Sequence, residues 1–158
     1  MSTGPTFFKA DWTDADFDQM GWHDCAVHAL AFETAPYCQR LLVDLDYIVE
    51  WTCPTPPATT YSFWVCPATL VFDPAWDLTG NIKLQGFGLE LWLDALERSG
   101  PDEHDAFEWT LAGQRFSLAV RAPGFTQYLR RPPIHSPHQR LSIDQRGGLS
   151  FDQQGYTR

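Results

Sequence analysis

The chain has 158 residues, enough for one domain with a buried core, and its 44% hydrophobic content argues against intrinsic disorder. Its net charge of −9 excludes a generally basic protein held to nucleic-acid phosphates by charge. No segment approaches the roughly 20 apolar residues of a membrane span, and the N-terminus lacks the basic and apolar regions of a signal peptide. We therefore expect a soluble cytoplasmic protein.

The charge is distributed unevenly along the chain. Residues 1–108 contain 18 acidic and 4 basic residues, whereas residues 109–158 contain 2 acidic and 7 basic ones. Because the apolar pattern continues across this join, we expect one domain, with an acidic lead-in (1–20), a β core (21–152) and a tail (153–158). The arginines of the basic part either pair with the chain's own carboxylates or form a local basic surface.

The first elements that the sequence predicts are a helical turn and a hairpin. Residues 12–21 are acidic and favour one short helical turn. Residues 40–51 alternate between apolar and other side chains, which is typical of a half-buried strand, and residues 22–33 pair with them antiparallel around Pro36.

This pairing predicts a polar face on the hairpin. It places His28 opposite Asp46 and Asp24 opposite Glu50, with Asp44 on the same face. Such a cluster could bind a hard divalent cation or keep a carboxylate protonated for acid–base catalysis. The alternative is a solvated face on which His28 pairs with Asp46.

The middle of the chain contains further strands. A Pro/Thr-rich break at 53–60 precedes an inner strand at 61–73, which is apolar on both faces up to its bend at a proline. Extended segments are expected at 82–84 and 89–93, and the alternation within 91–98 favours strand over helix.

Two hairpins are predicted in the last third. The first spans 107–120, with a two-residue loop at Gly113-Gln114. Its predicted pairs are Phe107 with Val120, Trp109 with Leu118, and Leu111 with Phe116. A proline-rich exposed connection at 130–138 leads to the second hairpin, whose loop at 146–148 places Ile143 opposite Phe151.

The predicted elements add up to a mainly β fold. Roughly seven to nine strands in an antiparallel meander would form a sandwich or barrel, with at most one or two short helices.

The four cysteines, at 25, 38, 53 and 66, contain no C-x-x-C pair and so predict no metal knuckle. We expect reduced, mostly buried thiols. Cys25 lies between two histidines, but as a strand residue it faces the core, which disfavours a nucleophilic role. No phosphate-binding or nucleophile motif is present in the sequence, so we expect no cofactor.

Aromatic and arginine residues gather between residues 125 and 140. Aromatic side chains with arginine are typical of protein-binding hot spots, and they can also stack on bases. The acidic remainder of the chain makes nucleic acid the less favoured partner. The alternative is a loop with ordinary core aromatics. The residues concerned are Phe125, Tyr128, Arg130, Arg131, His135, His138 and Arg140.

Five segments in this order, GWHDCAVHALAF, LLVDLDYIVEW, FWVCPATLVF, GFTQYLRRPP and RGGLSFD, resemble a family of small uncharacterised bacterial proteins over about residues 21–152. The resemblance implies a shared fold but supplies no activity, cofactor or catalytic residue.

We therefore expect a non-catalytic protein-binding module, whose most concrete version is an immunity-type protein that neutralises a basic toxin. The alternative is a metal-assisted hydrolase or a small-ligand binder that uses the face of His28, Asp44 and Asp46. The sequence does not indicate an oligomeric state.

Overall fold

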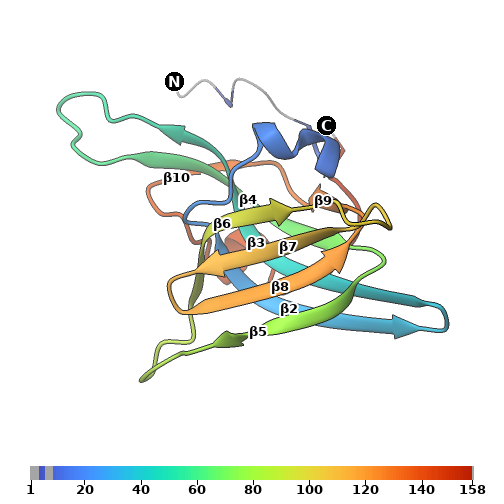
Figure 1. Cartoon of the computed structure of the whole chain (residues 1–158). Coiled ribbons are helices and arrows are strands. Elements are labelled where there is room, and N and C mark those ends of the chain that lie inside the picture. Colours follow the sequence, from blue (N-terminus) through green and yellow to red (C-terminus); the bar gives the residue numbers. More distant parts are fainter. Residues whose placement is uncertain (1–3, 6–8, 158) are drawn as a thin grey trace.

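The computed structural model of the chain describes residues 4–5 and 9–157 (Figure 1). Within them, ten strands form one antiparallel sheet, which is not closed into a barrel, in the order β1-β9-β4-β3-β2-β6-β7-β8-β5, with β10 paired to β4. The two short helices are a 3-10 helix, η1, and an α-helix, α1. The mainly antiparallel β prediction is confirmed. The elements are β1 (Asp11–Thr13), η1 (Asp14–Gln19), β2 (Ala26–Ala35), β3 (Cys38–Thr52), β4 (Ser62–Phe72), β5 (Trp76–Ile82), β6 (Leu91–Ser99), β7 (Phe107–Gly113), β8 (Phe116–Ala122), β9 (Phe125–Leu129), β10 (Ile134–Ser136) and α1 (Ile143–Arg146).

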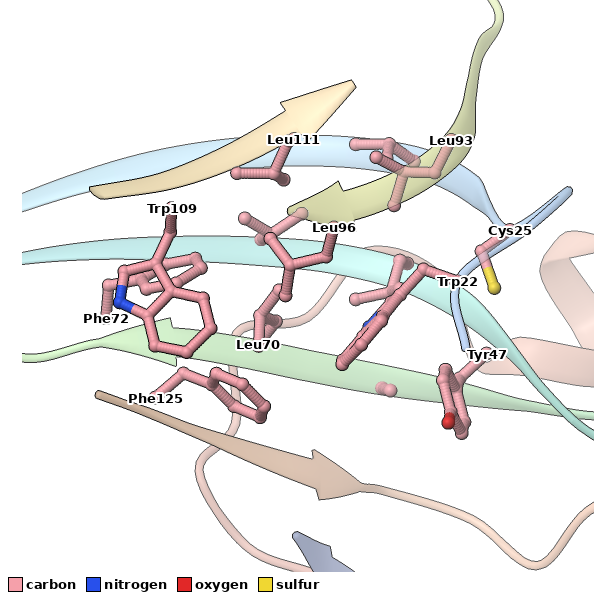
Figure 2. Close-up of a cluster of buried hydrophobic side chains, with 14 of the residues drawn as sticks. Trp22, Cys25, Tyr47, Leu70, Phe72, Leu93, Leu96, Trp109, Leu111 and Phe125 are labelled. Atoms are coloured by element: carbon pink, nitrogen blue, oxygen red, sulfur yellow. The ribbon is translucent and has the colours of Figure 1, made fainter. Parts of the chain in front are cut away.

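The sheet folds over itself, so that β6, β7 and β8 lie across β3, β4 and β9 (Figure 1). The buried side chains between the two layers, among them Leu96, Trp109 and Phe125, form the core (Figure 2). Trp109 of β7 is fully buried at the centre. Its ring centroid lies 5.2 Å from that of Phe125 on β9 and 6.0 Å from that of Phe72 on β4. The indole Nε1 donates to the carbonyl of Ala122 at 3.1 Å. These contacts join the two layers and satisfy the one polar atom of the side chain.

The leading hairpin is confirmed, but its register differs from the prediction. The two-residue loop is Pro36-Tyr37, and Tyr37 has φ +66°. Proline followed by a residue with positive φ is typical of a type II turn. A bulge interrupts the pairing at His28, so that Asp46 lies opposite Ala26 rather than opposite the histidine.

The β7–β8 hairpin is also confirmed, with its loop one residue later, at Gln114-Arg115. Gly113 therefore belongs to the strand. A Cβ at this position would collide with the Trp92 carbonyl and the Phe116 ring. The glycine is needed for close packing rather than for the turn. The observed pairs are Phe107 with Ala122, Trp109 with Val120, and Leu111 with Leu118.

The inner strand predicted over 61–73 is β4, which lies between β3 on one side and β9 and β10 on the other. Pro67 lies where β4 changes partner, between Val65, which pairs with β10, and Ala68, which pairs with β9. Proline has no N–H to donate, and its carbonyl accepts from the backbone of Arg130 at 2.9 Å. This local break explains why an inner strand tolerates a proline.

Other local predictions have mixed outcomes. The strand predicted over 91–98 is β6, and η1 is the helical turn predicted within 12–21. The segment at 82–84 is not a separate strand, since β5 ends at Ile82. Part of the connection predicted as exposed forms β10, where Ser136 is buried.

The second predicted hairpin is wrong. Residues 143–146 form α1 instead, and Ile143 is 75% exposed. The Ser142 hydroxyl accepts from the backbone of Gln145, whose side chain accepts from the backbone of Ser142. Gly147, with φ +75°, ends the helix. The S-x-x-Q capping box and the glycine C-cap therefore prevail over the strand pattern.

All four cysteines are free; Cys25 and Cys66 are buried, Cys38 is half-buried and Cys53 is exposed. Burial raises the pKa of Cys25 to about 12, which keeps it a protonated, unreactive thiol. Among the described residues, no helix is long and apolar enough to span a membrane.

We predict that Trp109→Ala lowers the free energy of unfolding by about 3–5 kcal/mol, because it removes the central contact between the two layers. Urea unfolding followed by circular dichroism measures this change. Phe87→Ala, at a fully exposed aromatic residue, is the control and should change stability by less than about 0.5 kcal/mol. Equal effects of the two substitutions would contradict the assignment of the core.

Candidate functional site

The polar face of β3 is a buried ion cluster rather than a solvated surface. Alternate residues of β3 face the core, and Asp44 and Asp46 lie between them on the opposite face. Both aspartates are nevertheless fully buried, since Arg146 and backbone groups at Leu141 and Ser150 contact their carboxylates. The C-terminal segment 141–150 therefore covers this face of β3. The expectation that solvent covers this face is wrong for Asp44 and Asp46.

Arg146 lies at the centre of the cluster. Its Nη2 and Nη1 donate to the two oxygens of Asp44 at 2.6 and 3.0 Å, a bidentate pair. Its Nε donates to Asp46 at 3.0 Å. Helix α1 ends at Arg146, and Nη1 also donates to the carbonyl of Gly148 just beyond it. One guanidinium thus joins both carboxylates to the end of the helix.

The second oxygen of Asp46 holds two further groups. It accepts from the backbone of Leu141 at 2.9 Å and lies 2.7 Å from Nε2 of His28. The predicted contact between His28 and Asp46 is confirmed, although it arises from the bulge rather than from direct pairing across the strands. The His28 side chain is only 8% exposed.

Arg130 completes the cluster from the end of β9. Its Nη2 donates to Asp44 at 2.8 Å and its Nη1 to the hydroxyl of Thr69 at 2.9 Å. Two guanidiniums therefore balance two carboxylates within a desolvated space. For Arg130 and Arg146, the expectation that the arginines pair with the chain's own acids is confirmed.

Burial by itself raises the pKa of Asp44, but hydrogen bonds from Arg146 and Arg130 and their positive charges outweigh it and hold that pKa below its ordinary value. Burial lowers the pKa of Arg146, and the hydrogen bond to Asp44 together with the charges of Asp46 and Asp44 raises it overall. The lowered pKa of Asp44 and the raised pKa of Arg146 both keep the pair ionised.

Every oxygen of the two carboxylates accepts at least one hydrogen bond from an arginine or a backbone amide. A hard cation would need these oxygens free and would have to displace a guanidinium. Among the residues that the structure describes, no three His, Cys, Asp or Glu side chains are placed to hold a metal ion. The arrangement therefore acts as an internal clamp on the C-terminal segment.

The aromatic and arginine residues at 125–140 do not form one exposed surface. Phe125 is in the core, and Arg130 belongs to the ion cluster. Tyr128 is half-buried on β9, in register with Asp11 of β1. Arg131 is exposed and donates to backbone carbonyls of α1 at 3.3 and 3.5 Å.

His135 and His138 are exposed, and Arg140 is half-buried. His135 lies near Ser62, with 2.8 Å between its Nε2 and the hydroxyl oxygen.

An aromatic surface that the sequence did not predict lies at the end of β3. It consists of His23, Trp51 and Tyr61. The imidazole stacks on the Trp51 ring at a centroid distance of 5.9 Å, and Tyr61 meets the same ring edge-on at 5.9 Å. Trp51 and Tyr61 are 39% and 49% exposed, while buried Phe63 supports Trp51 from below at 4.9 Å. Trp51 is thus exposed but held in place.

An acidic pocket of about 320 Å³ lies beside this surface. Three carboxylates and one indole form much of its wall, namely Asp24, Glu90, Asp94 and Trp92, and Gly88, Gln114 and Arg115 complete it. The Trp92 Nε1 donates to Glu90 at 3.3 Å. Asp24 therefore lines this pocket, whereas His28, Asp44 and Asp46 of the same predicted face form the ion cluster.

The aromatic surface and the acidic pocket meet at His23 and Asp24, where Nε2 of the imidazole lies 3.8 Å from the carboxylate. Asp24 has φ +61°, a left-handed conformation that aspartate tolerates. Its backbone donates to the carbonyl of Leu93 on β6 at 2.8 Å, which holds the backbone of Asp24 against β6. No local sequence pattern predicts that the aromatic surface and the acidic pocket adjoin. Trp92 and Asp94 of the pocket lie on β6, which comes about 70 residues later in the chain than Asp24.

Comparisons of the chain with protein-family models, with curated proteins and with solved structures find no match.

We predict that Arg146→Met lowers the free energy of unfolding by about 3–5 kcal/mol, since it leaves two buried carboxylates without their shared cation. Chemical unfolding measures this change. Arg131→Met removes an exposed guanidinium from the same segment and should change stability by less than about 0.5 kcal/mol. Equal free energies of unfolding for Arg146→Met and Arg131→Met would show that the ion cluster does not stabilise the fold.

The lowered pKa of Asp44 predicts acid sensitivity. The stability that it contributes is fully present above the unfolded-state pKa of about 3.9 and is lost as the pH falls through the lower folded-state pKa. The free energy of unfolding should therefore fall below about pH 4, and less steeply in Asp44→Asn. Carbon NMR of the Asp44 carboxyl group measures its pKa directly. This explanation would be refuted if the stability of the wild type and of Asp44→Asn fell equally with pH and the Asp44 carboxyl group had an ordinary pKa.

Proposed function

We propose that this protein is a non-catalytic binding module that recognises another protein through the aromatic surface and the adjoining acidic pocket. The observation that carries the proposal is Trp51, a large side chain that is exposed, stacked against His23 and Tyr61 and supported by a buried ring. Tryptophan and tyrosine dominate the energetics of protein interfaces. An aromatic group already held in place loses little conformational entropy on binding.

The pocket indicates the chemistry of the partner. Three carboxylates around an indole favour a guanidinium or ammonium group, and Arg115 on the wall offsets part of the negative charge. The net charge of −9 attracts a basic protein over a longer range. A partner that places an arginine or lysine in the pocket and an apolar group against Trp51 would use both features.

We place this role in the bacterial cytoplasm, in keeping with the resemblance to small bacterial proteins. Its most specific form is an immunity-type protein that neutralises a basic toxin. The closed ion cluster supports a role without catalysis, because His28, Asp44 and Asp46 are already engaged with one another or with arginine. The unreactive Cys25 thiol supports it as well.

We predict that a basic peptide, with arginine and leucine alternating, shifts the indole NMR signals of Trp51 and Trp92 when added to isotope-labelled protein. The same peptide with glutamate in place of arginine should leave these signals unchanged. Trp51→Ala with Tyr61→Ala should weaken binding at least about tenfold, as expected for the loss of hot-spot residues. The exposed substitution Tyr37→Ser, at the opposite end of β3 from Trp51, is the control and should bind normally.

Two results would overturn the proposed surface. One is a basic peptide that shifts signals over the whole acidic surface without preference for Trp51 or Trp92. The other is a double variant that binds as tightly as the wild-type protein.

A further inference from the structure

Strand β5 forms a free edge of the sheet. It pairs with β8 on one side and, among the described strands, with none on the other (Figure 1). All its residues from Asp77 to Ile82 are exposed, and residues 78–82 include neither a charged residue nor a proline. The other end of the sheet is the three-residue β1. Proteins commonly protect an edge strand by shortening it, by charging it or by a bulge; β5 has a bulge at Asp77 and Leu78, but residues 79–82 beyond it are uncharged.

The outward-facing backbone groups of β5 can be identified from the ladder. Lys83, directly after the strand, donates its N–H to the carbonyl of Arg115 at 2.8 Å, so it still pairs towards β8. Backbone N–H groups alternate in direction along a strand, and the pairing is continuous from Thr79 to Ile82. The N–H and C=O groups of Gly80 and Ile82 therefore point away from β8.

We infer that two copies of this chain associate through β5, paired antiparallel with Gly80 opposite Gly80. In this register the outward-facing groups of Gly80 meet those of Gly80 on the second copy, and those of Ile82 reach Leu78 at the bulge. Leu78, which is 38% exposed, lies opposite Ile82 of the second copy, which is 47% exposed. Thr79 lies opposite Asn81. The same contact is made twice, as a two-fold axis requires.

The flanking charges fit the same register. Asp77, which lies in the bulge with φ +53°, falls near Lys83 of the second copy just beyond the regular ladder, and this pair also forms twice. Lys83 forms no ion pair with any of the residues described here, and the Asp77 carboxylate lies 3.9 Å from Arg121 with its side chain 72% exposed. Since each chain carries −9, two copies repel each other in general. Pairing along an uncharged segment between two opposite-charge pairs reduces that repulsion.

The geometry also sets the strength of the association. The bulge at Asp77 and Leu78 leaves only Thr79 to Ile82 in regular pairing on each chain. Such a ladder covers less than the roughly 800 Å² per partner of a standard interface. The dimer should therefore depend on protein concentration.

Sedimentation equilibrium of the full chain over a wide concentration range tests this proposal. The average mass should rise from 18.0 kDa towards twice that value. Lys83→Glu replaces two attractive pairs by two repulsive ones and should weaken self-association about tenfold or more. Arg131→Glu makes the same charge change on an exposed residue beyond β9, away from the β5 edge and from the acidic pocket, and should associate as the wild type does. A wild-type protein that stays monomeric at every concentration would overturn the proposal.

The register itself can be tested with a mixture. Asp77→Lys alone and Lys83→Glu alone each bring like charges together across the interface. An equimolar mixture of the two variants restores both opposite-charge pairs in the mixed dimer. It should therefore associate more tightly than either variant by itself. A mixture no heavier than the separate variants would refute this register even if the wild type dimerises.

Discussion

The bidentate pair between Arg146 and Asp44, with the same guanidinium reaching Asp46, is the interaction on which the C-terminal part of the structure depends. Two carboxylates on an inner strand would be very costly to bury without a cation. The cation comes from a helix of four residues, too short to be stable alone, about 100 positions later in the chain. Strand β3 and the segment 141–150 therefore stabilise each other.

This cluster also explains part of the uneven charge along the sequence. The acidic part of the chain supplies both carboxylates, and the basic part supplies both arginines. Two of the seven cations after residue 108 are thus internal partners rather than members of a basic surface. The acidic pocket, by contrast, faces outward, so the charge available to another molecule at that position is mainly negative.

Sequence reasoning could predict whatever depends on local chemistry. Alternation located β3, β6 and the β7–β8 hairpin, and Pro36 located the first turn, because each signal lies within the element itself. The pattern does not predict α1, since a two-glycine loop flanked by apolar residues resembles a hairpin, although the S-x-x-Q spacing at Ser142 and Gln145 is a local signal for the start of a helix. The bulge at His28 and the burial of Asp44 were beyond reach. Both depend on which segment covers β3, and alternation alone does not say whether a polar face meets water or an arginine.

A closed interior cluster and an open aromatic surface divide the molecule into a part that holds the fold and a part available for recognition. Native-state hydrogen exchange of the backbone amides of Leu141 and Ser150 tests this division most directly. Both amides lie outside the strands and α1, yet each donates to a buried carboxylate, at 2.9 and 3.1 Å. The clamp predicts that they exchange about as slowly as the amides of β3 and become fast in Arg146→Met. Fast exchange of both amides in the wild-type protein would contradict it.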